Sequence, residues 1–336
     1  MGILFLFLHL ISAGHIWKFV TLAYIPPTIA GVVLAYRKKY LLGGIVTALF
    51  IALQIQSNHI QMSYYFMFVI LFFVGAYFED AYKKKELPHF FKASGVLALA
   101  AVVGVCINIS NLYHTYEYSK ETMRGKSELK QEGAAASQTS SGLDRDYITN
   151  WSYGIGETLT LLVPNVKGGG SGSTMSQSEA AMAKANPMYN GIYSQLPQYF
   201  GEQPWTAGPV YVGAFVMFLF VLGCFIVKGP LKWALLGATI FSILLSWGKN
   251  FMGLTDFFID YVPMYNKFRA VSSILVIAEF TIPLLAIFAL KEILNKPDTL
   301  KLKENRGGVI ATLVLTAGVA LILAVAPGVS SSSFVT

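Results

Sequence analysis

Apolar residues occur along most of this chain in long uninterrupted runs, without the alternation of a half-buried strand. A helix that crosses a bilayer needs about 20 mainly apolar residues. The pattern therefore predicts an all-α membrane protein with eight full spans. The eight runs are Trp17–Tyr36, Tyr40–Gln56, Met62–Phe78, Ala93–Leu112, Pro209–Val227, Leu231–Trp247, Ala270–Leu290 and Gly307–Ala326.

A further apolar run, Met1–Ser12, is too short to cross a membrane alone. A signal peptide is not predicted, because no basic residue precedes the apolar stretch. We interpret this run as a truncated N-terminal span and expect the chain to begin inside a helix of a larger protein.

Basic residues in short loops predict the orientation of the spans, since Lys and Arg concentrate on the cytoplasmic side. Alternate short loops carry most of them, and this side is therefore expected to be cytoplasmic. These residues are Arg37, Lys38, Lys39, Lys83, Lys84, Lys85, Lys92, Lys228, Lys232, Lys291, Lys296, Lys301, Lys303 and Arg306. The short loops of the other side hold only Lys18, Lys249, Lys267 and Arg269.

One long polar segment divides the chain into three regions. Residues 1–112 and 208–336 hold the predicted spans, and residues 113–207 form a large extracytoplasmic loop. Within this loop, Asp144–Val163 is expected to form an amphipathic helix with Asp144 as its N-cap. The tract between Lys167 and Lys184, which contains GGGSGS, has no apolar period and is expected to be mobile.

Composition supports a membrane protein and excludes several other classes. The 336 residues are 54% hydrophobic and only 13% charged, with a mean hydropathy of +0.55. Soluble globular domains carry about 25% charged residues. A soluble enzyme and a nucleic-acid-binding module are therefore not expected, and the net charge of +7 reflects the loop lysines.

Glu279 is the clearest charge inside a predicted span. Such residues are rare in membrane helices and often functional. Two interpretations stay open: a carboxyl group that pairs with a neighbouring helix or stays protonated, and a direct functional role.

Polar residues also gather at the predicted outer ends of the helices. Near the loop after residue 248, Asp256 and Asp260 lie four positions apart, on one face of a short helix for which Thr255 is the expected cap. Lys267 and Arg269 follow on the predicted extracytoplasmic side, where Lys and Arg are otherwise rare. These cations either pair with the two aspartates or hold an anionic head group, because guanidinium and ammonium groups both bind phosphate.

Two further groups of polar residues on the outer side give weaker indications of function. His59 lies in a polar turn that either is simply solvated or belongs to a site near His15 and His114. Asp144 and Asp146 form an acid–x–acid pair that resembles those of sugar transferases, although a helix cap explains it equally well. No His/Cys spacing indicates a metal, so no cofactor is predicted; a divalent ion stays possible.

Several segments together resemble the YfhO family of bacterial multi-pass membrane proteins, which is similar to GT-C glycosyltransferases. The segments are SAGHIWKFVTLAYIPPTIAG (12–31), KYLLGGIVTALFIALQIQSNHIQMSYY (39–65), GLDRDYITNWSYGIGETLTLLVPN (142–165), YFGEQPWTAGPVYVGA (199–214) and DYVPMYNKFRAVSSILVIAEFTIPLL (260–285).

The resemblance implies a GT-C-like enzyme of the bacterial inner membrane. It would transfer a sugar from a polyprenyl-phosphate carrier to a cell-envelope acceptor on the outer face. We expect Lys267, Arg269, Lys18, His15 and His59 to bind the donor phosphate, among membrane lipids.

The chain departs from the family in its length. Family members are longer, and the first outer loop, which typically carries the catalytic acid, is not expected in this chain. Asp144 or Asp146 is then the expected catalytic carboxylate. The alternatives are a lipid-linked saccharide transporter or flippase, with Glu279 as a proton relay, and a surface-polysaccharide polymerase or ligase.

Overall fold

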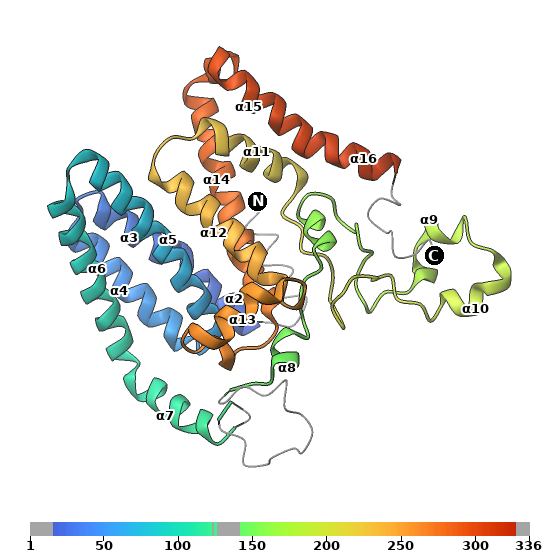
Figure 1. The fold of residues 1–336 in the computed structure, drawn as a ribbon, viewed down its shortest axis with the longest axis horizontal. Coiled ribbons are helices and arrows are strands. Elements are labelled where there is room, and N and C mark those ends of the chain that lie inside the picture. The colour runs from blue at the N-terminus through green and yellow to red at the C-terminus, as the bar shows by residue number, and fades with distance from the viewer. Residues whose placement is uncertain (1–15, 123, 126–141, 327–336) are drawn as a thin grey trace.

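The structure, a computed structural model, describes residues 16–122, 124–125 and 142–326. The regular elements in this part of the chain are all helices (Figure 1). The β-structure within the same residues is a single antiparallel bridge between Thr174 and Pro197. His15 and the predicted span Met1–Ser12 lie outside the described residues.

The first half of the chain forms a closely packed group of long helices. Gly43 in α4 lies so close to α3 that an added Cβ would be 2.5 Å from the backbone nitrogen of Ala35. Small residues therefore let these two backbones approach, as at many membrane-helix contacts. The packed helices are α2 (Ile16–Ala23), α3 (Ile25–Tyr36), α4 (Tyr40–Gln56), α5 (Ile60–Lys84) and α6 (Leu87–Ile107). α7 (Ile109–Lys120) follows α6 and buries none of its residues.

The second half packs around α14 (Val276–Asn295), whose side chains are mostly buried. α12 (Pro230–Ser246) contacts both α14 and α5 and so joins the two halves. The other long helices of this half are α11 (Ala214–Ile226), α13 (Met252–Tyr261), α15 (Lys303–Leu313) and α16 (Val319–Val325); a π-helical turn joins the last two. The short helices α9 (Glu179–Met182) and α10 (Asn190–Tyr193) precede α11.

Among the residues that the structure describes, five helices are long and apolar enough to cross a membrane, and a sixth arises if α12 and α13, bent by 108° at Gly248, count as one span. The five are Ile16–Tyr36, Ile60–Lys84, Leu87–Ile107, Val271–Asn295 and Lys303–Val325. Two more predicted spans are shorter apolar helices, α4 and α11. The predicted count of eight is therefore not confirmed.

α11 is short because the start of its apolar run is not helical. The Thr160 hydroxyl donates to the Val210 carbonyl at 3.1 Å, and the Val212 amide donates to the Leu161 carbonyl at 3.4 Å. Gly213 then has a positive φ of 100°, and the helix begins at Ala214. Hydrogen bonds to a distant segment thus replace the helix that hydropathy alone predicts.

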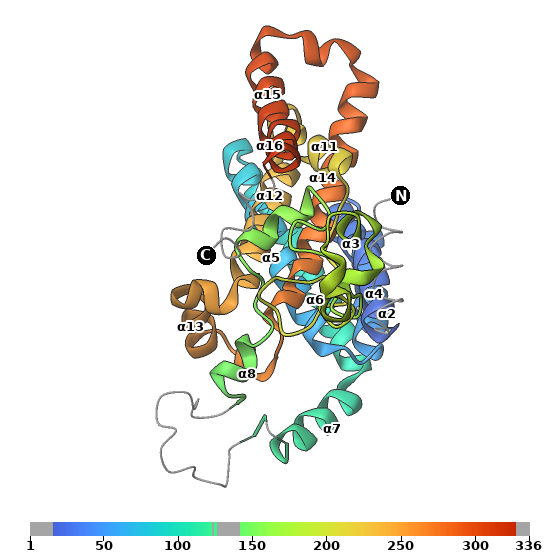
Figure 2. The same cartoon turned by 90° about the vertical axis from the view of Figure 1, so that its right-hand side faces the viewer.

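The lysine-rich turns lie at one end of the helices. An ion pair of 3.3 Å between Lys38 and Glu86 joins the α3–α4 turn to the α5–α6 turn. Figure 2 shows the α14–α15 junction at the opposite end of the molecule from α7 and α8. We call the end that holds α7, α8 and α13 the outer side, since the charge pattern predicts it to be extracytoplasmic.

The predicted helix Asp144–Val163 is wrong, because this segment is broken into two short helices. α8 spans Arg145–Thr149, and a 3-10 helix, η1, spans Gly156–Leu161. Between them, the Tyr153 amide donates to the Ser246 carbonyl at 2.8 Å. Backbone groups there bond to α12 and its neighbours instead of to one another. The N-cap prediction is confirmed, since the Asp144 side chain accepts from the Asp146 amide at 2.8 Å.

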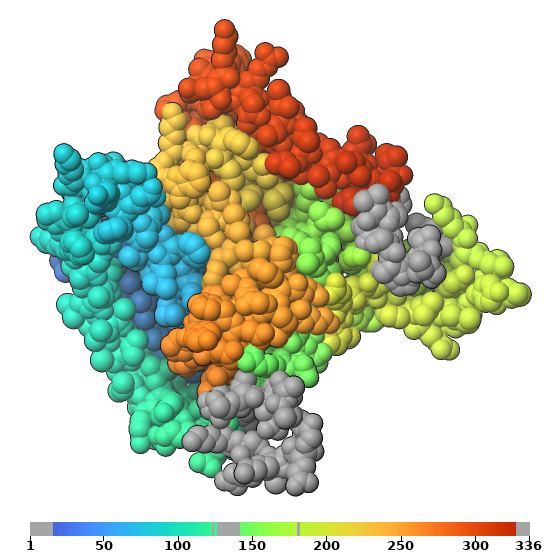
Figure 3. Space-filling model, in the orientation of Figure 1, coloured from blue at the N-terminus to red at the C-terminus, as the bar shows by residue number. Residues whose placement is uncertain are grey.

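The glycine-rich tract has defined backbone partners, in contrast to the expected lack of structure. A Cβ on Gly168 would be 1.7 Å from the Gln198 carbonyl oxygen, and a Cβ on Gly170 would be 2.6 Å from that of Ala207. The Ser171 amide also donates to the Thr206 carbonyl at 2.8 Å. Only glycine fits between these backbones. We call residues 167–170 and 198–207 the neck; they carry the projecting arm, residues 171–197, seen in Figure 3.

Candidate phosphate-binding site

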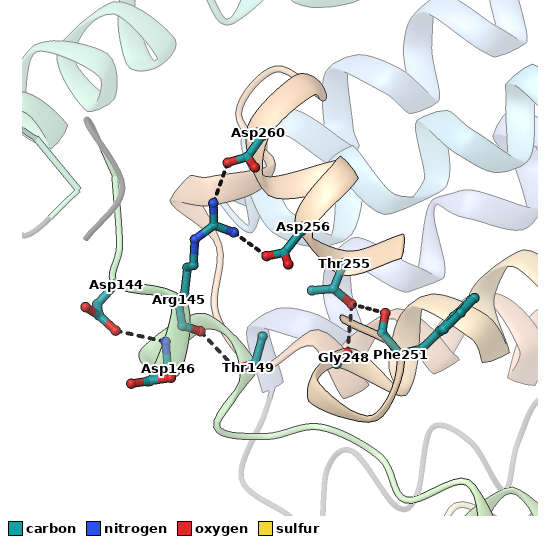
Figure 4. Close-up of polar contacts among 9 residues, drawn as sticks. All are labelled: Asp144, Arg145, Asp146, Thr149, Gly248, Phe251, Thr255, Asp256 and Asp260. Carbon is teal, nitrogen blue, oxygen red and sulfur yellow. Dashed lines mark hydrogen bonds and ion pairs between the residues drawn. The ribbon is translucent and has the colours of Figure 1, made fainter. Parts of the chain in front are cut away.

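Arg145 fastens the start of α8 to α13 on the outer side (Figure 4). Its guanidinium contacts the Asp256 carboxylate and donates to Asp260 at 2.7 Å. The Asp260 hydrogen bond raises the pKa of Arg145. The two aspartates, which sequence reasoning offered as partners of Lys267 and Arg269, are thus paired instead with one cation from α8.

The predicted catalytic pair Asp144 and Asp146 lies at the first turn of α8. Asp144 caps the helix through a carboxylate oxygen, whereas the Asp146 side chain is exposed to solvent. Both carboxylates therefore stand near Arg145 but outside the clamp that it makes with α13 (Figure 4).

Thr255 is not the cap of its helix, because α13 already begins at Met252. The Thr255 hydroxyl is buried and donates to the carbonyls of Gly248 and Phe251, at 2.9 and 3.2 Å. It therefore fixes the sharp bend that separates α12 from α13.

Arg269 is held by contacts from two separate elements, α8 and α5. Its guanidinium donates to the Tyr147 hydroxyl at 2.5 Å, and its backbone carbonyl accepts from Gln61 at 2.7 Å. Lys18, at the outer end of α2, lies close enough for the two cations to repel each other. Two of the predicted donor-binding residues, Lys18 and Arg269, are therefore brought together.

Lys267 is paired with a residue that sequence reasoning missed. Its ammonium group donates to the Arg124 carbonyl at 2.6 Å, and Arg124 Nε donates to the Lys267 carbonyl at 3.0 Å. Burial lowers the pKa of Lys267. Arg124 follows α7 in a polar stretch with no pattern, so only the fold reveals that it reaches this position.

We call Lys18, Arg124, Lys267 and Arg269 the cationic rim. Within the described part of the chain, the ion pairs include none of these four cations. Clustered cations without carboxylate partners repel one another and are stabilised by a bound anion. The outer side therefore presents a surface suited to phosphate.

His59 lies just before α5, on the turn whose Ser57 hydroxyl is 2.5 Å from the Thr21 hydroxyl of α2. Gln61, two residues further on, reaches both Tyr65 and the Arg269 backbone. The polar turn is thus not merely solvated, because it joins α2 and the rim.

Glu279 occupies the outer part of α14 and is partly exposed. Among the described residues it forms no ion pair or hydrogen bond. Burial raises the pKa of Tyr153, and the negative charges of Glu157 and Glu279 raise it further. Glu279, the predicted intramembrane acid, therefore lies near Tyr153, which belongs to the segment that joins α8 to η1.

Glu157 is a buried carboxylate that sequence reasoning did not single out. Its side chain is 2% exposed, accepts from the Gly154 amide at 2.5 Å and contacts the Tyr199 hydroxyl. A Cβ on Gly201 would come within 2.1 Å of the carboxylate. The signal available in the sequence was a lone acid that follows two glycines in a mainly apolar segment, YGIGET. Glu157 ties η1 to the neck.

No group of three or more His, Cys, Asp or Glu residues in the described ranges could hold a metal ion. In comparisons with known proteins, no protein-family profile, curated protein or solved structure matches the chain. The candidate site therefore stands on its geometry alone.

Proposed function

We propose that this protein is a membrane glycosyltransferase of the bacterial inner membrane, with a GT-C-like arrangement. It moves a sugar from a polyprenyl-phosphate donor to a cell-envelope acceptor on the outer face. The observation that carries the proposal is the cationic rim, whose four cations have no carboxylate partner among the described residues and lie at the outer ends of candidate membrane-spanning helices.

The rim would serve the reaction by stabilising the leaving group. When the sugar leaves its carrier, negative charge develops on the phosphate oxygen that is released. Arg269 can grip two phosphate oxygens, and Lys18 adds a point charge beside it. Donors held in place before the reaction stabilise such charge more than water does.

A carboxylate must accept the proton of the attacking acceptor hydroxyl. Asp144 and Asp146 are the acids that we propose for this role. Asp146 is the stronger candidate because its side chain is exposed, whereas Asp144 is engaged in capping. Tyr147, the next residue, contacts Arg269, which supports a location of both acids beside the rim.

The test is sugar transfer by the purified chain from a polyprenyl-phosphate sugar to an envelope acceptor. Arg269→Gln is expected to weaken donor binding, and Asp146→Asn to lower the rate while donor binding is retained. Lys120→Gln is the matched control, because Lys120 is also an outer cation but is paired with Glu117 at 2.7 Å. Unchanged transfer and donor affinity in Arg269→Gln would refute the proposal.

A second proposal, transport of a lipid-linked saccharide, rests on Glu279. A partly buried acid inside a membrane helix, without a partner among the described residues, is typical of proton relays. The proteoliposome test is flux of a labelled lipid-linked sugar without a new glycosidic bond. Glu279→Gln would abolish its dependence on pH; flux that keeps the parent's pH dependence would exclude this role. A polymerase or ligase would instead lengthen or attach a glycan in the same assay.

A further inference from the structure

The α3–α4 turn and the α5–α6 turn are joined at the end of α6 opposite α7. His89 Nδ1 is 2.7 Å from the Tyr40 hydroxyl oxygen, and its Nε2 is 2.9 Å from the Tyr36 carbonyl oxygen. Lys38 also pairs with Glu86 at 3.3 Å. The two turns therefore form one surface, which we call the basic surface. Its cations are Arg37, Lys38, Lys39, Lys83, Lys84, Lys85 and Lys92.

Buried contacts beneath the basic surface fix the positions of its two turns. The Tyr36 ring stacks on Tyr77, with centroids 4.3 Å apart, and on Phe90, at 5.7 Å. Gly44 of α4 lies so close to α6 that an added Cβ would be 2.9 Å from Val96 Cγ1. Helix packing, rather than contact among the cations, thus holds the charges together.

The basic surface carries an excess of positive charge. Each of its three carboxylates is already paired with one lysine: Glu79 with Lys83, Asp80 with Lys84, and Glu86 with Lys38. In the described part of the chain, the other four cations, Arg37, Lys39, Lys85 and Lys92, take part in no ion pair. Like charges repel one another, so a bound anion stabilises this surface.

Tyr40 brings a cation from each turn together. Lys39 precedes it along the chain and is exposed, and Lys92 Nζ is 4.7 Å from the centroid of the Tyr40 ring. An aromatic ring attracts a cation but does not neutralise its charge. Both lysines can therefore still bind an anion.

The starts of two helices add to the same positive potential. α4 begins at Tyr40 and α6 at Leu87, and neither first turn receives a hydrogen bond from its N-cap side chain. The N-terminal end of a helix carries a partial positive charge. The two helix starts therefore reinforce the attraction that the lysines exert on an anion.

Exposed apolar side chains adjoin Lys39 and Lys92 and indicate what kind of anion fits. Leu41, directly after Tyr40, is 78% exposed, and Phe91, directly before Lys92, is 62% exposed. A free phosphate would leave both side chains uncovered. A phospholipid covers them, because its phosphate meets the cations while its acyl chains contact the apolar side chains.

We propose that the basic surface binds an anionic phospholipid, whose phosphate lies between Lys39 and Lys92 and whose acyl chains lie along Leu41 and Phe91. The inference goes beyond the proposed function and does not depend on it, because the cationic rim lies at the other end of the helices. A bound lipid would connect α4 to α6 and so stabilise the first half of the molecule.

The experiment measures lipid binding to the full chain in detergent by native mass spectrometry. The probes are phosphatidylglycerol, which is anionic, and phosphatidylcholine with the same acyl chains, which has no net charge. The unmodified chain is expected to bind its first phosphatidylglycerol at least about fivefold more tightly than its first phosphatidylcholine. The double variant K39Q/K92Q should reduce this preference to less than about twofold.

The matched control is K83Q/K84Q, which removes the same number of positive charges from the same surface. Lys83 and Lys84 are already paired with carboxylates, so this variant should keep a preference of at least about threefold. An equal loss of preference in the two double variants would show a general effect of net charge and overturn the inference. Equal affinity of the parent for both lipids, or an unchanged preference in K39Q/K92Q, would overturn it as well.

Two further measurements identify the source of the anion and the state of the fold. Inorganic phosphate should not displace phosphatidylglycerol; complete displacement would show a site for small anions and overturn the assignment to a lipid. Thermal unfolding without lipid should be the same for K39Q/K92Q and the parent. Phosphatidylglycerol should then raise the unfolding temperature of the parent more than that of the variant, because a ligand stabilises the state that binds it; an equal increase in both would contradict the proposal.

Discussion

Arg269 lies against Tyr147, with a hydrogen bond of 2.5 Å to the phenol oxygen and the guanidinium carbon 5.4 Å from the ring centroid. Tyr147 belongs to α8, which Arg145 in turn fastens to Asp256 and Asp260. A continuous series of contacts thus runs from α13 through α8 to the cationic rim. The position of Arg269 depends on residues that themselves touch no phosphate.

Arg145→Met tests this dependence. We expect the affinity for a polyprenyl phosphate to fall by about three- to tenfold, because α8 loses its anchor and Tyr147 no longer positions Arg269. Stability should fall by only on the order of 1 kcal/mol, since the aspartates are more than a third exposed. Lipid binding and thermal unfolding are the measurements. A normal affinity in a well-folded variant would show that α8 does not position the rim.

Gly168→Ala tests the packing of the neck. Gly168 has φ 81°, and an added Cβ would be 1.7 Å from the Gln198 carbonyl oxygen. The backbone strain alone costs about 1–3 kcal/mol, so the neck should open and limited proteolysis of the arm should accelerate. Gly172→Ala is the matched control, because no heavy atom lies within 4 Å of its added Cβ. Equal cleavage of both variants would mean that the tract is a plain flexible linker.

Tyr199→Phe tests the attachment of the arm at high pH. Burial raises the pKa of Tyr199, and the hydrogen bond to Glu157 raises it further. An unfolded tyrosine loses its proton near pH 10, whereas the folded one keeps it. Stability from this group is therefore present below pH 10 and is lost as the pH rises above that value.

The measurement is arm proteolysis between pH 8 and pH 12, with tyrosine absorbance as a monitor of ionisation. Cleavage in the parent should increase above about pH 10. Tyr199→Phe should be cleaved faster at neutral pH, because Glu157 loses a hydrogen-bond donor, and should respond less to alkali. A pH response identical to the parent would show that other tyrosines control it; Tyr153 and Tyr265 also have raised pKa values.

Single-cysteine labelling in intact cells tests the orientation of the helices. Lys120→Cys should react with a membrane-impermeant maleimide added outside, because Lys120 is exposed at the end of α7 on the outer side. Lys296→Cys should react only after permeabilisation. Cys106 and Cys224 are replaced by serine in both variants, since both are free thiols. Labelling of Lys120→Cys only from the cytosol would reverse the topology and remove both proposals.

The sequence predicts the long helices well, because apolar runs of sufficient length leave few alternatives in a bilayer. Ile60–Lys84 and Val271–Asn295 contain their predicted runs, apart from Ala270. The prediction fails where the backbone bonds to a distant segment. Two examples are Pro209–Gly213 and Trp151–Ile155. Their hydrogen-bond partners lie on other elements, and no local sequence pattern predicts these bonds.

The site was predictable only as single residues. Lys18, Lys267 and Arg269 were identified because they violate the charge rule, and the structure places Lys18 beside Arg269. Arg124 and the neutralisation of Asp256 by Arg145 depend on the fold, and no spacing along the chain encodes them. The glycine triplet 168–170 was likewise not predictable, because the same sequence is compatible with a flexible linker and with a tightly packed crossing of two backbones.

The length of α11 has a consequence for the surrounding lipid. Its 13 residues span about 20 Å, whereas the hydrocarbon interior of a bilayer is about 30 Å thick. Phe215 and Phe225, near its two ends, remain exposed on the outside of the molecule. Were α11 to cross a bilayer, the acyl chains beside it would have to compress or tilt, and the membrane would be thinner along this edge of the protein.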